Sequence, residues 1–596
     1  MRLSSNLWLE KEFYIDVDHM GQIRVVGPGD HLYFGMINGE SRDYEITKVY
    51  YRNNELFIKG YFYDSKVQFF YPVMGDIRTL RTYVYKKDEK AKTFFEIREA
   101  FPDVLIPNKF HESVIDGTKR LNFERHFGKE FYGSELRLSA TVKVERKDNY
   151  FILSSSEPVI PFEIKVYDSR FFKQEFFADP FLRKQIFFEK FGIEGDIART
   201  ILHRAEAEVD HLLKYKKTSG YDYGTVFPRD WTEAAFLGLN DFSKEALFYI
   251  AKQSLKYVSV EGEGWHERCV GEFAYKCNLS HVPNIDRDMV DIEPRYMLLF
   301  GQNPDIFLNN ETLFKKIKRV ASFIITQARE NYLIQFEENP HFRNFKAGNW
   351  RDSSAAYLGV SSHIIPYDTN AVFYPAALRI IEQFADNLHI KDKDLKKIVS
   401  DWQNKKELFK FKNKDGKPAY ALAIYDFKNK NNYKKLEINH TDEAYDLIFN
   451  NSNEEDIKSL AERILSNDYF YTKIGPLIVG KNEGYNHNQY HGEVIWLKQM
   501  GLCSMGFKNQ YRKEGFSEET NELIKKTIKY LFDSLVYSFG YLNLFPELFV
   551  DYKESPVLYS ERRFVVEGHM NKIQLWSAEA ARRIVFDYYD VFFKSE

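Results

Sequence analysis

The hydrophobic period of this chain changes near residue 175, and this change constrains the fold more than any other feature. Before it, many short segments have β-strand character, and turns rich in Gly, Asn, Asp and Pro separate them. These segments are QIRVV, HLYFGM, YEITKVYY, ELFIKGYFY, KVQFFYPV, TLRTYVYK, TFFEIRE, LRLSATVKVE, NYFILSS and PFEIKVYD. Short strands at such regular spacing predict an antiparallel β-sandwich, which we expect to span residues 1–175.

After about residue 180, apolar residues recur every three or four positions, which is the period of an amphipathic helix. The first such run contains Ile193, Ile197, Ile201, Ala205, Val209 and Leu212. Similar runs occur near 232–257, 311–328, 368–385, 456–466, 519–536 and 573–587, and loops rich in Gly, Asn, His and Trp separate them. We therefore expect residues 176–596 to form an all-helical domain, a toroid of paired helices whose loops build a cleft at one end.

Composition and charge argue against several classes of protein. The 596 residues are 44% hydrophobic with a formal net charge of −3, which is typical of a globular protein and predicts no nucleic-acid partner. No stretch approaches the roughly 18 to 20 apolar residues of a membrane span, and the N-terminus lacks the apolar core of a signal peptide. The three cysteines are too few for a disulfide framework or a zinc site. We expect a cytoplasmic protein without a cofactor or a membrane partner, and its oligomeric state stays open.

The segment 346–384 concentrates the most chemistry. Its second half has the helical period from Asp368 onward, whereas a Gly-Asn pair interrupts regular structure just before Trp350, Arg351 and Asp352. An indole beside a carboxyl raises the pKa of that carboxyl by desolvation, as a general acid requires, whereas an adjacent guanidinium lowers it. The residues alone leave two interpretations open: Asp352 is a general acid, or it is a solvated loop acid paired with Arg351.

Other loops also carry polar residues next to the expected helices. Arg229 and Asp230 follow a proline at the start of a helix, where they form either a capping ion pair or part of a binding site. The acidic loop 286–293 lacks the spacing and the glycine turn of a calcium loop. His487 and His491 are four residues apart but lack the general-base glutamate of a zinc peptidase. We therefore predict no bound metal.

Two of these segments resemble motifs of the glucosidase part of glycogen-debranching enzymes and of neutral invertases. W-R-D-S followed by I-P-Y-D-T-N-A-V-F-Y-P-A-A-L is similar to their W-M-D or M-I-D triplet and the helix that begins E-I-N-A-L-W-Y. The aspartate of that triplet is the general acid of the family, so the resemblance implies this role for Asp352. L-F-P-E-L followed by N-K-I-Q-L-W-S-A is similar to the L-P-E-L motif and the C-x-x-Q-A-W-S-A helix of debranching enzymes. It implies that Glu547 is the catalytic base.

Further loops resemble substrate-binding loops of the same enzymes. F-P-R-D-W is similar to F-V-R-D-F of invertases and W-P-R-D of glucoamylases, V-D at 290–291 to V-D-A-L-W-F, and G-W-H-E-R more weakly to a P-H-E loop. Y-N-H-N-Q-Y-H-G-E-V-I-W resembles Y-H-N-G-x-V-W-P, but Glu493 stands where relatives have a small residue and is either a subsite contact or an extra carboxylate. The substrate-binding residues expected from these motifs are Arg229, Asp230, Trp231, His266, Asp291, Trp350, His491, Glu493 and Trp576.

The motifs occur in the family order between residues 221 and 577, and the resemblance implies an (α/α)6 barrel. The first domain lacks the N-G-L-G-G-Y and T-R-R-Y-H-G-L motifs of bacterial debranching enzymes. We expect an inverting glycoside hydrolase that cleaves an α-glucosidic bond of an oligosaccharide, with its two carboxyl groups roughly 6.5 to 9.5 Å apart. The alternatives are an invertase- or trehalase-like disaccharide hydrolase and a catalytically inactive carbohydrate-binding protein.

Overall fold

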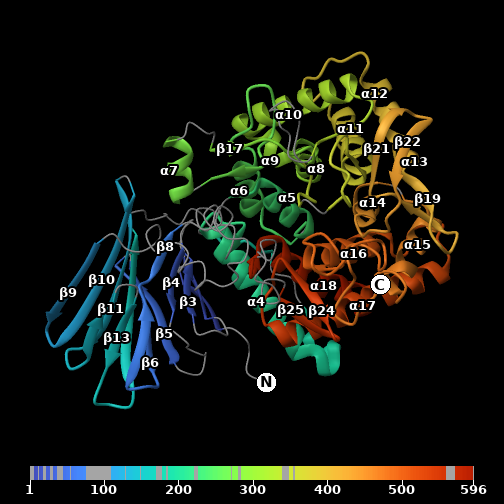
Figure 1. The fold of residues 1–596 in the computed structure, drawn as a ribbon. Helices are drawn as coiled ribbons and strands as arrows, with labels where there is room; N and C mark the ends of the chain where they lie inside the picture. Colours follow the sequence, from blue (N-terminus) through green and yellow to red (C-terminus); the bar gives the residue numbers. More distant parts are fainter. Residues whose placement is uncertain are drawn as a thin grey trace.

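The computed structural model contains a β-sheet region followed by a largely helical region, and Figure 1 shows the two side by side. It describes residues 6–10, 13–17, 22–26, 31–35, 44–53, 55–75, 109–127, 129–147, 150–168, 178–182, 186–220, 226–239, 241–269, 271–279, 284–337, 348–353, 356–450, 452–558 and 571–594. None of the helices among these residues is long and apolar enough to cross a membrane.

The strands of the first region form three antiparallel sheets. One sheet has the order β1 (Asn6–Glu10), β2 (Phe13–Val17), β3 (Gln22–Val26), β4 (His31–Gly35) and β8 (Val73–Gly75). A second has the order β5 (Tyr44–Arg52), β6 (Glu55–Phe62), β14 (Ile160–Asp168), β11 (Glu130–Ser139), β10 (Thr118–Phe127) and β9 (Lys109–Ile115). The third has the order β12 (Lys143–Arg146), β13 (Tyr150–Ser154) and β7 (Lys66–Phe70).

Aromatic rings join the second and third sheets. The ring of Phe69 on β7 lies 4.8 Å from that of Phe62 on β6 and 5.7 Å from that of Phe151 on β13. The ring of Phe123 on β10 lies 5.8 Å from that of Phe151. These residues belong to one apolar core, which also takes in Ile15 from the first sheet and is separate from the core of the helical region.

The described strands agree in part with those expected from sequence. Strands β3 to β7, β13 and β14 lie where their segments were expected, whereas TLRTYVYK and TFFEIRE lie outside the described residues. LRLSATVKVE was expected as one strand, but a turn divides it between β11 and β12. Strands β1, β2, β9 and β10 were not predicted. In β10 one of the four buried positions is Arg125, which interrupted the apolar pattern.

The helical region contains long helices joined by loops and short strands. Its helices are η1 (Phe188–Glu194), α4 (Gly195–Lys214), α5 (Pro228–Leu237), α6 (Lys244–Ser254), α7 (Gly271–Leu279), α8 (Ile292–Gln302), α9 (Pro304–Leu308), α10 (Glu311–Glu330), the π-helix η2 (Asp368–Phe373), α11 (Tyr374–Gln383), α12 (Leu395–Gln403), α13 (Lys406–Phe409), α14 (Glu443–Phe449), α15 (Glu454–Leu465), α16 (Leu497–Gln510), α17 (Glu518–Leu542) and α18 (Leu575–Phe592).

Short strands pair the loops between these helices. The antiparallel pairs and ladders are β15 (Ser219–Gly220) with β26 (Ile573–Gln574), β16 (Glu267–Arg268) with β17 (Ile285–Asp286), β18 (Ile365–Pro366) with β21 (Ala423–Asn429) and β22 (Asn432–Leu436), β19 (Lys410–Lys412) with β20 (Pro418–Tyr420), and β23 (Ile495–Trp496) with β24 (Leu548–Tyr552) and β25 (Ser555–Leu558). Several of these strands lie directly before a helix, so they fix where that helix begins.

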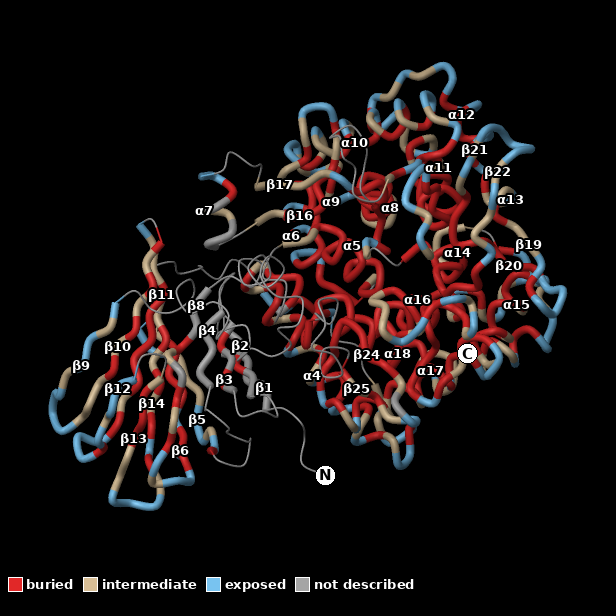
Figure 2. Tube along the Cα trace, in the orientation of Figure 1, coloured by how far each residue is buried: buried red, intermediate tan, exposed pale blue. Residues whose placement is uncertain are grey.

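Helices that are buried over most of their length contact one another in a closed series. Helix α5 contacts α8, α8 contacts α11 and η2, η2 contacts α14, α14 contacts α16, α16 contacts α18, and α18 contacts α5. Figure 2 shows buried residues filling the middle of this region. Helices α4, α6, α10, α12 and α17 lie outside this series, where they contact α18, α5, α8, α11 and α16 respectively.

The helix boundaries correct one expectation from the sequence. The run at 232–257 is two helices, α5 and α6, because the chain turns after Gly238. A Cβ at Gly238 would lie 2.4 Å from the ring of Phe242, so a side chain there would collide with the turn. The other expected runs correspond to α4, α10, η2 with α11, α15, α17 and α18.

The contact between α16 and α18 depends on a glycine, which gives a test of the packing. A Cβ on Gly501 would lie 2.5 Å from the Cβ of Ala580, so Gly501→Ala overpacks this contact and is expected to lower the free energy of unfolding by about 1–3 kcal/mol. Gly540→Ala in α17 is the matched control, because no atom lies within 4 Å of the added Cβ. It is expected to raise stability by up to about 1 kcal/mol through helix propensity. Denaturant titrations followed by circular dichroism measure both changes, and equal effects of the two variants would refute close packing at Gly501.

Candidate active site

Several charged residues of the candidate site lie at or near the N-terminal ends of the buried helices. Arg229 and Asp230 are in the first turn of α5, where Pro228 begins the helix with its fixed backbone angle. Asp291 directly precedes α8, Asp368 opens η2, and Asp442 directly precedes α14. Helix N-termini carry partial positive charge and unpaired N–H groups, so they stabilise carboxylates at these positions.

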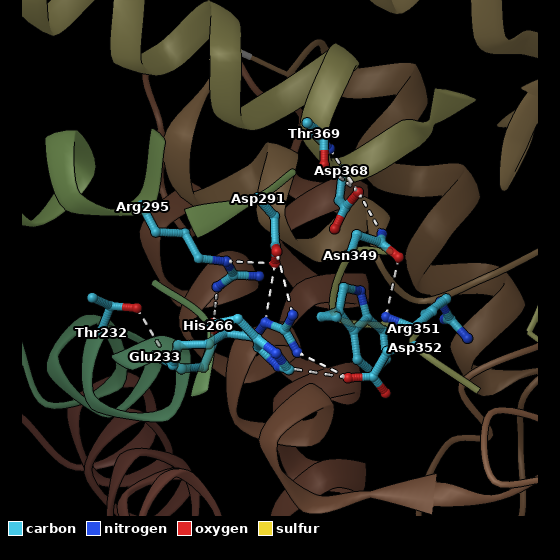
Figure 3. Close-up of polar contacts among 12 residues, drawn as sticks. Thr232, Glu233, His266, Asp291, Arg295, Asn349, Arg351, Asp352, Asp368 and Thr369 are labelled. Carbon is cyan, nitrogen blue, oxygen red and sulfur yellow. Dashed lines mark hydrogen bonds and ion pairs between the residues drawn. The ribbon is translucent and has the colours of Figure 1, made fainter. Parts of the chain in front are cut away.

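Arg229 lies between two carboxylates that come from different loops. Its Nε lies 3.2 Å from Asp291 Oδ2, its Nη2 donates to Asp291 Oδ1 at 3.4 Å, and its Nη1 donates to Asp352 Oδ2 at 3.4 Å (Figure 3). The side chain of Asp291 is fully buried, and the charges of Arg229 and Arg295 hold its pKa below the usual value despite the opposing effect of burial. Arg229 and Asp291 therefore form an ionised pair in the interior.

Arg295 extends this network on the side away from Asp352. Its Nε donates to Asp291 Oδ2 at 3.0 Å, and its Nη1 forms an ion pair with Glu233. Tyr445 Oη donates to Glu233 Oε1 at 2.8 Å. Sequence reasoning missed these three residues, although Glu233 is four residues after Arg229 and Arg295 is four residues after Asp291. This helical spacing was the available signal.

Asp352 is the most exposed acid of the cluster, with 31% of its side chain accessible. Arg229 and His266 both approach its Oδ2 atom, whereas Figure 3 draws no contact to the other oxygen. Arg351 is directed elsewhere, because its Nε and Nη2 donate to the two carboxylate oxygens of Asp442 at 2.8 and 3.0 Å. The interpretation of Asp352 as an acid paired with Arg351 is therefore not what the structure shows.

Aromatic rings form a wall behind the Asp352 loop. The Trp350 ring lies 5.6 Å from that of Trp496 and 5.3 Å from that of His491, and its Nε1 donates to Asp442 Oδ2 at 3.3 Å. The Lys498 ammonium lies 3.6 Å from the Trp350 ring centre and 4.7 Å from that of Trp576. Burial lowers the pKa of Lys498 to about 8. Sequence reasoning did not identify this residue.

His491 connects this wall to the Asp352 loop. Its Nδ1 lies 2.8 Å from Ser353 Oγ, next in sequence to Asp352, and burial lowers its pKa well below the usual value. The neutral imidazole is therefore available as a hydrogen-bonding group. Glu493, in contrast, accepts a hydrogen bond from the backbone N–H of Asn482 at 3.1 Å, so one of its carboxylate oxygens holds its own loop together.

Glu547 lies beside Asp230 on another side of the cluster. Its Oε2 accepts hydrogen bonds from Asn571 N and Nδ2 at 3.0 and 3.2 Å, and only 5% of the residue is exposed. Gln574 Nε2 donates to Asp230 Oδ2 at 2.6 Å. Burial and then the negative charge of Glu547 raise the pKa of Asp230 well above its usual value, which places the two carboxyls in one electrostatic environment.

Trp231 does not join the charged cluster. It is fully buried, and its ring lies 5.6 Å from that of Tyr249 on α6 in an edge-to-face arrangement. Its neighbours in sequence point to the cluster, but Trp231 lies on the face of α5 that packs against α6. The expectation that Trp231 binds substrate stays a prediction.

His266 lies next to Asp352 and is also close to two other potential ligand groups. Its Nδ1 lies 3.1 Å from Asp286 Oδ2, and one ligand atom each of His266, Glu267 and Asp286 lie within 4.8 Å of one another. Nitrogen and carboxylate oxygens at this spacing have the chemistry to hold a cation, so the expected absence of a metal remains a prediction. Hydrogen bonds from His266 and Asp288 lower the pKa of Asp286 to about 2 against the effect of burial.

No family model and no curated protein matches the chain. Among solved structures it is similar to an alpha mannosidase of a metal-independent family from Streptococcus pneumoniae in complex with alpha-1,6-mannobiose, at 14% identity over 68% of this chain and 96% of that one, with a TM-score of 0.44. A GH63 mannosylglycerate hydrolase from Thermus thermophilus in complex with glucose has 11% identity over 62% and 94% of the two chains and a TM-score of 0.39.

A rhamnosidase from Klebsiella oxytoca with rhamnose bound covers more of the chain, with 9% identity over 92% of this chain and 89% of that one and a TM-score of 0.42. All three are glycoside hydrolases by description. At these identities and TM-scores, the likeness carries no conclusion about the fold or the reaction of this chain. The resemblance to debranching enzymes therefore depends on the sequence motifs.

Asp368 gives a pH-dependent test of the site. Burial and the negative charges of Asp291 and Asp442 raise its pKa to about 7. From about pH 4 to about pH 7, the folded protein then keeps a proton that the unfolded chain has lost, so this group lowers stability as pH rises through that window. In Asp368→Asn, Oδ1 can still accept from Asn349 Nδ2 and Thr369 N, and the amide replaces Oδ2, which has no hydrogen-bond partner.

The free energy of unfolding of Asp368→Asn relative to wild type is expected to increase by up to about 3 kcal/mol between pH ~5 and pH ~8. Denaturant titrations at a series of pH values measure this difference. Asp196→Asn is the control, because 99% of the Asp196 side chain is exposed. A difference for Asp368→Asn that is constant with pH would mean that Asp368 is already ionised at the acidic end.

Proposed function

We propose that the protein is an inverting glycoside hydrolase that cleaves an α-glucosidic bond of an oligosaccharide, with Asp352 as general acid and Glu547 as general base. The observation that carries this proposal is the link between the two carboxyls through consecutive residues of α5. Arg229 contacts Asp352 at 3.4 Å, and the charge of Glu547 acts on Asp230. This link between two acids that are distant in sequence supports a shared site, as glycoside hydrolysis requires.

The arrangement of the helices supports an (α/α)6 toroid as the framework of this function. The buried helices form a closed series of contacts, and the outer helices cover it. Arg229, Asp230 and Asp291 lie at the starts of buried helices, which is where a toroid places the loops of one end. The two separate cores support a division into a β-sandwich domain at 1–175 and a catalytic domain at 176–596.

The proposed mechanism assigns each side chain a part of the reaction. Asp352 protonates the leaving oxygen, and its partial exposure gives the substrate access to it. Glu547 accepts a proton from the attacking water, and the two hydrogen bonds from Asn571 orient its carboxylate. Arg229 and Asp230 hold sugar hydroxyls beside the scissile bond. Asp291 is fully buried under Arg229, so its part is to hold the guanidinium in place.

The aromatic wall supports the site from behind, because Trp350 and Trp576 are almost fully buried. Trp350 and Trp576 flank the buried Lys498, and neutral His491 is available to a hydroxyl. Glu493 is assigned a loop-stabilising part because of its bond to Asn482. We propose a cytoplasmic setting for the enzyme, and its three cysteines carry free thiols.

Release of monosaccharide from a substrate panel tests the proposal. Panose, isomaltose and maltose represent the proposed α-glucosidic bonds, and sucrose and trehalose represent the invertase- and trehalase-like alternatives. Hydrolysis restricted to sucrose or trehalose would replace the debranching-type assignment. Sugar binding without release from any member would identify a binding protein.

The two proposed catalytic residues are expected to be individually necessary. Glu547→Gln removes the base, and Asp352→Asn removes the proton donor, while each keeps the shape of the side chain. Each is expected to reduce turnover by roughly 10²- to 10⁴-fold without unfolding the protein. Glu311→Gln and Asp196→Asn, at side chains that are 81% and 99% exposed, are the matched controls. Turnover within a few-fold of wild type in either site variant would exclude that residue from its assigned role.

The stereochemistry of the product gives an independent test. An inverting enzyme needs space for a water molecule between base and anomeric carbon, so the first sugar released is expected to have the opposite anomeric configuration to the substrate. NMR of the fresh product from the wild-type enzyme measures this. Azide is expected to restore turnover of Glu547→Gln and to yield a glycosyl azide of opposite configuration. A first product with the configuration of the substrate would make Glu547 a nucleophile and not a base.

A further inference from the structure

Asp286, His266 and Asp352 form a row of acid, imidazole and acid. His266 Nδ1 lies 3.1 Å from Asp286 Oδ2, and its Nε2 lies 3.9 Å from Asp352 Oδ2. The two ring nitrogens therefore face two different carboxylates. Figure 3 shows His266 lying alongside Asp352.

The surroundings hold His266 in this orientation. The backbone N–H of His266 donates to Asp286 O at 2.7 Å, and the pairing of β16 with β17 fixes the two segments. The ring of Phe227 lies 5.5 Å from the imidazole, and only 8% of the His266 side chain is exposed. Asp286 is 35% exposed and Asp352 31%, so both ends of the row reach solvent while its middle is buried.

An acid and a base that act in an inverting hydrolysis both end each cycle in the wrong protonation state. The acid has given its proton to the leaving oxygen, and the base has taken one from water. A proton must therefore return to the acid before the next turnover. A carboxylate behind an imidazole fixes the orientation of the ring and stabilises its protonated form, which prepares the other nitrogen for proton transfer.

Resting on the proposed function, we infer that His266, positioned by Asp286, returns the proton to Asp352 after each turnover. In this step the N–H bond at Nε2 of the imidazolium breaks and an O–H bond forms at Asp352 Oδ2. The imidazole becomes neutral and keeps its Nδ1 proton on Asp286. A hydronium ion then protonates Nε2 and leaves water, so each cycle consumes one solvent proton at this end, and Glu547 releases one at the other.

Other charged side chains also lie close to Asp352 and His266. Arg229 of α5 lies 3.4 Å from Asp352 Oδ2. Its positive charge is also paired with the Asp291 carboxylate. Glu267 lies close enough to His266 and Asp286 to form a cation site with them. A cation site is therefore the competing interpretation of His266 and Asp286, and it predicts sensitivity to chelators.

Comparison of two substrates tests the inference. Maltose needs a proton on its leaving oxygen, whereas α-glucosyl fluoride has a leaving group that needs little protonation and so does not depend on a recharged acid. For His266→Gln and Asp286→Asn, we expect the loss in kcat on maltose to exceed the loss on the fluoride by at least about 10-fold, with little change in KM. If another glycoside of the panel is the substrate, it takes the place of maltose, with the corresponding fluoride.

A rescue experiment separates proton return from a purely structural part. In His266→Ala, added imidazole is expected to restore kcat on the glycoside, because a diffusing imidazole can supply the proton. His203→Gln and Asp196→Asn, at exposed positions of α4, are the matched controls and should equal wild type. Equal losses on both substrates together with absence of rescue would overturn the inference.

Two further results, on the wild-type protein, would point to other conclusions. Loss of wild-type activity in a chelator and its recovery with zinc or calcium would replace proton return by a cation site at His266, Glu267 and Asp286. Failure of the wild-type protein to hydrolyse any glycoside or the fluoride would refute the proposed function itself. A loss of activity that occurs only in the His266 and Asp286 variants bears only on the role of these two residues. Failure of the inference is therefore distinguishable from failure of the proposed function.

Discussion

The buried ion pairs around Arg229 are the interaction on which the rest of the site depends. Removing a guanidinium from water costs several kcal/mol, and this cost is offset only when carboxylates with good geometry surround it. Asp291 supplies both of its oxygens, and Asp352 supplies one. Arg229 therefore fixes the distance between α5 and α8 and also holds the Asp352 loop. Loss of one partner would leave an unpaired charge in the interior, which typically costs about 3–5 kcal/mol.

The two proposed catalytic acids have different surroundings for a physical reason. Asp352 belongs to a loop, keeps 31% of its side chain exposed and faces two nitrogen-bearing side chains. Glu547, which lies just before β24, is 5% exposed, and Asn571 orients its carboxylate. A donor must reach the leaving oxygen of a large substrate, whereas a base needs only to reach one water molecule. Unequal exposure of the two carboxyls follows this difference in task.

Hydrophobic periodicity predicted much of the fold, but helices with little exposed surface were difficult to predict. Outer helices such as α4 and α10 have one apolar face and one polar face, and their runs marked them clearly. Helix α16 is buried along almost its whole length, so it has no polar face and no visible period. Helix α14 is short and carries buried acids, which hid it as well. The separation of α5 from α6 depends on a single glycine turn.

The sequence by itself determined where the polar loops lie, that Arg229, Asp230 and Asp291 stand near the starts of helices, that Asp352 lies in a loop, and how the motifs resemble those of debranching enzymes. Only the tertiary structure decided which charges pair. Arg351 is adjacent to Asp352 in sequence but binds Asp442, 91 residues away, while Asp352 faces Arg229 across 123 residues. The reason is that pairing follows the directions in which side chains leave their loops. Those directions are set by how distant helices pack, and local periodicity does not contain that information.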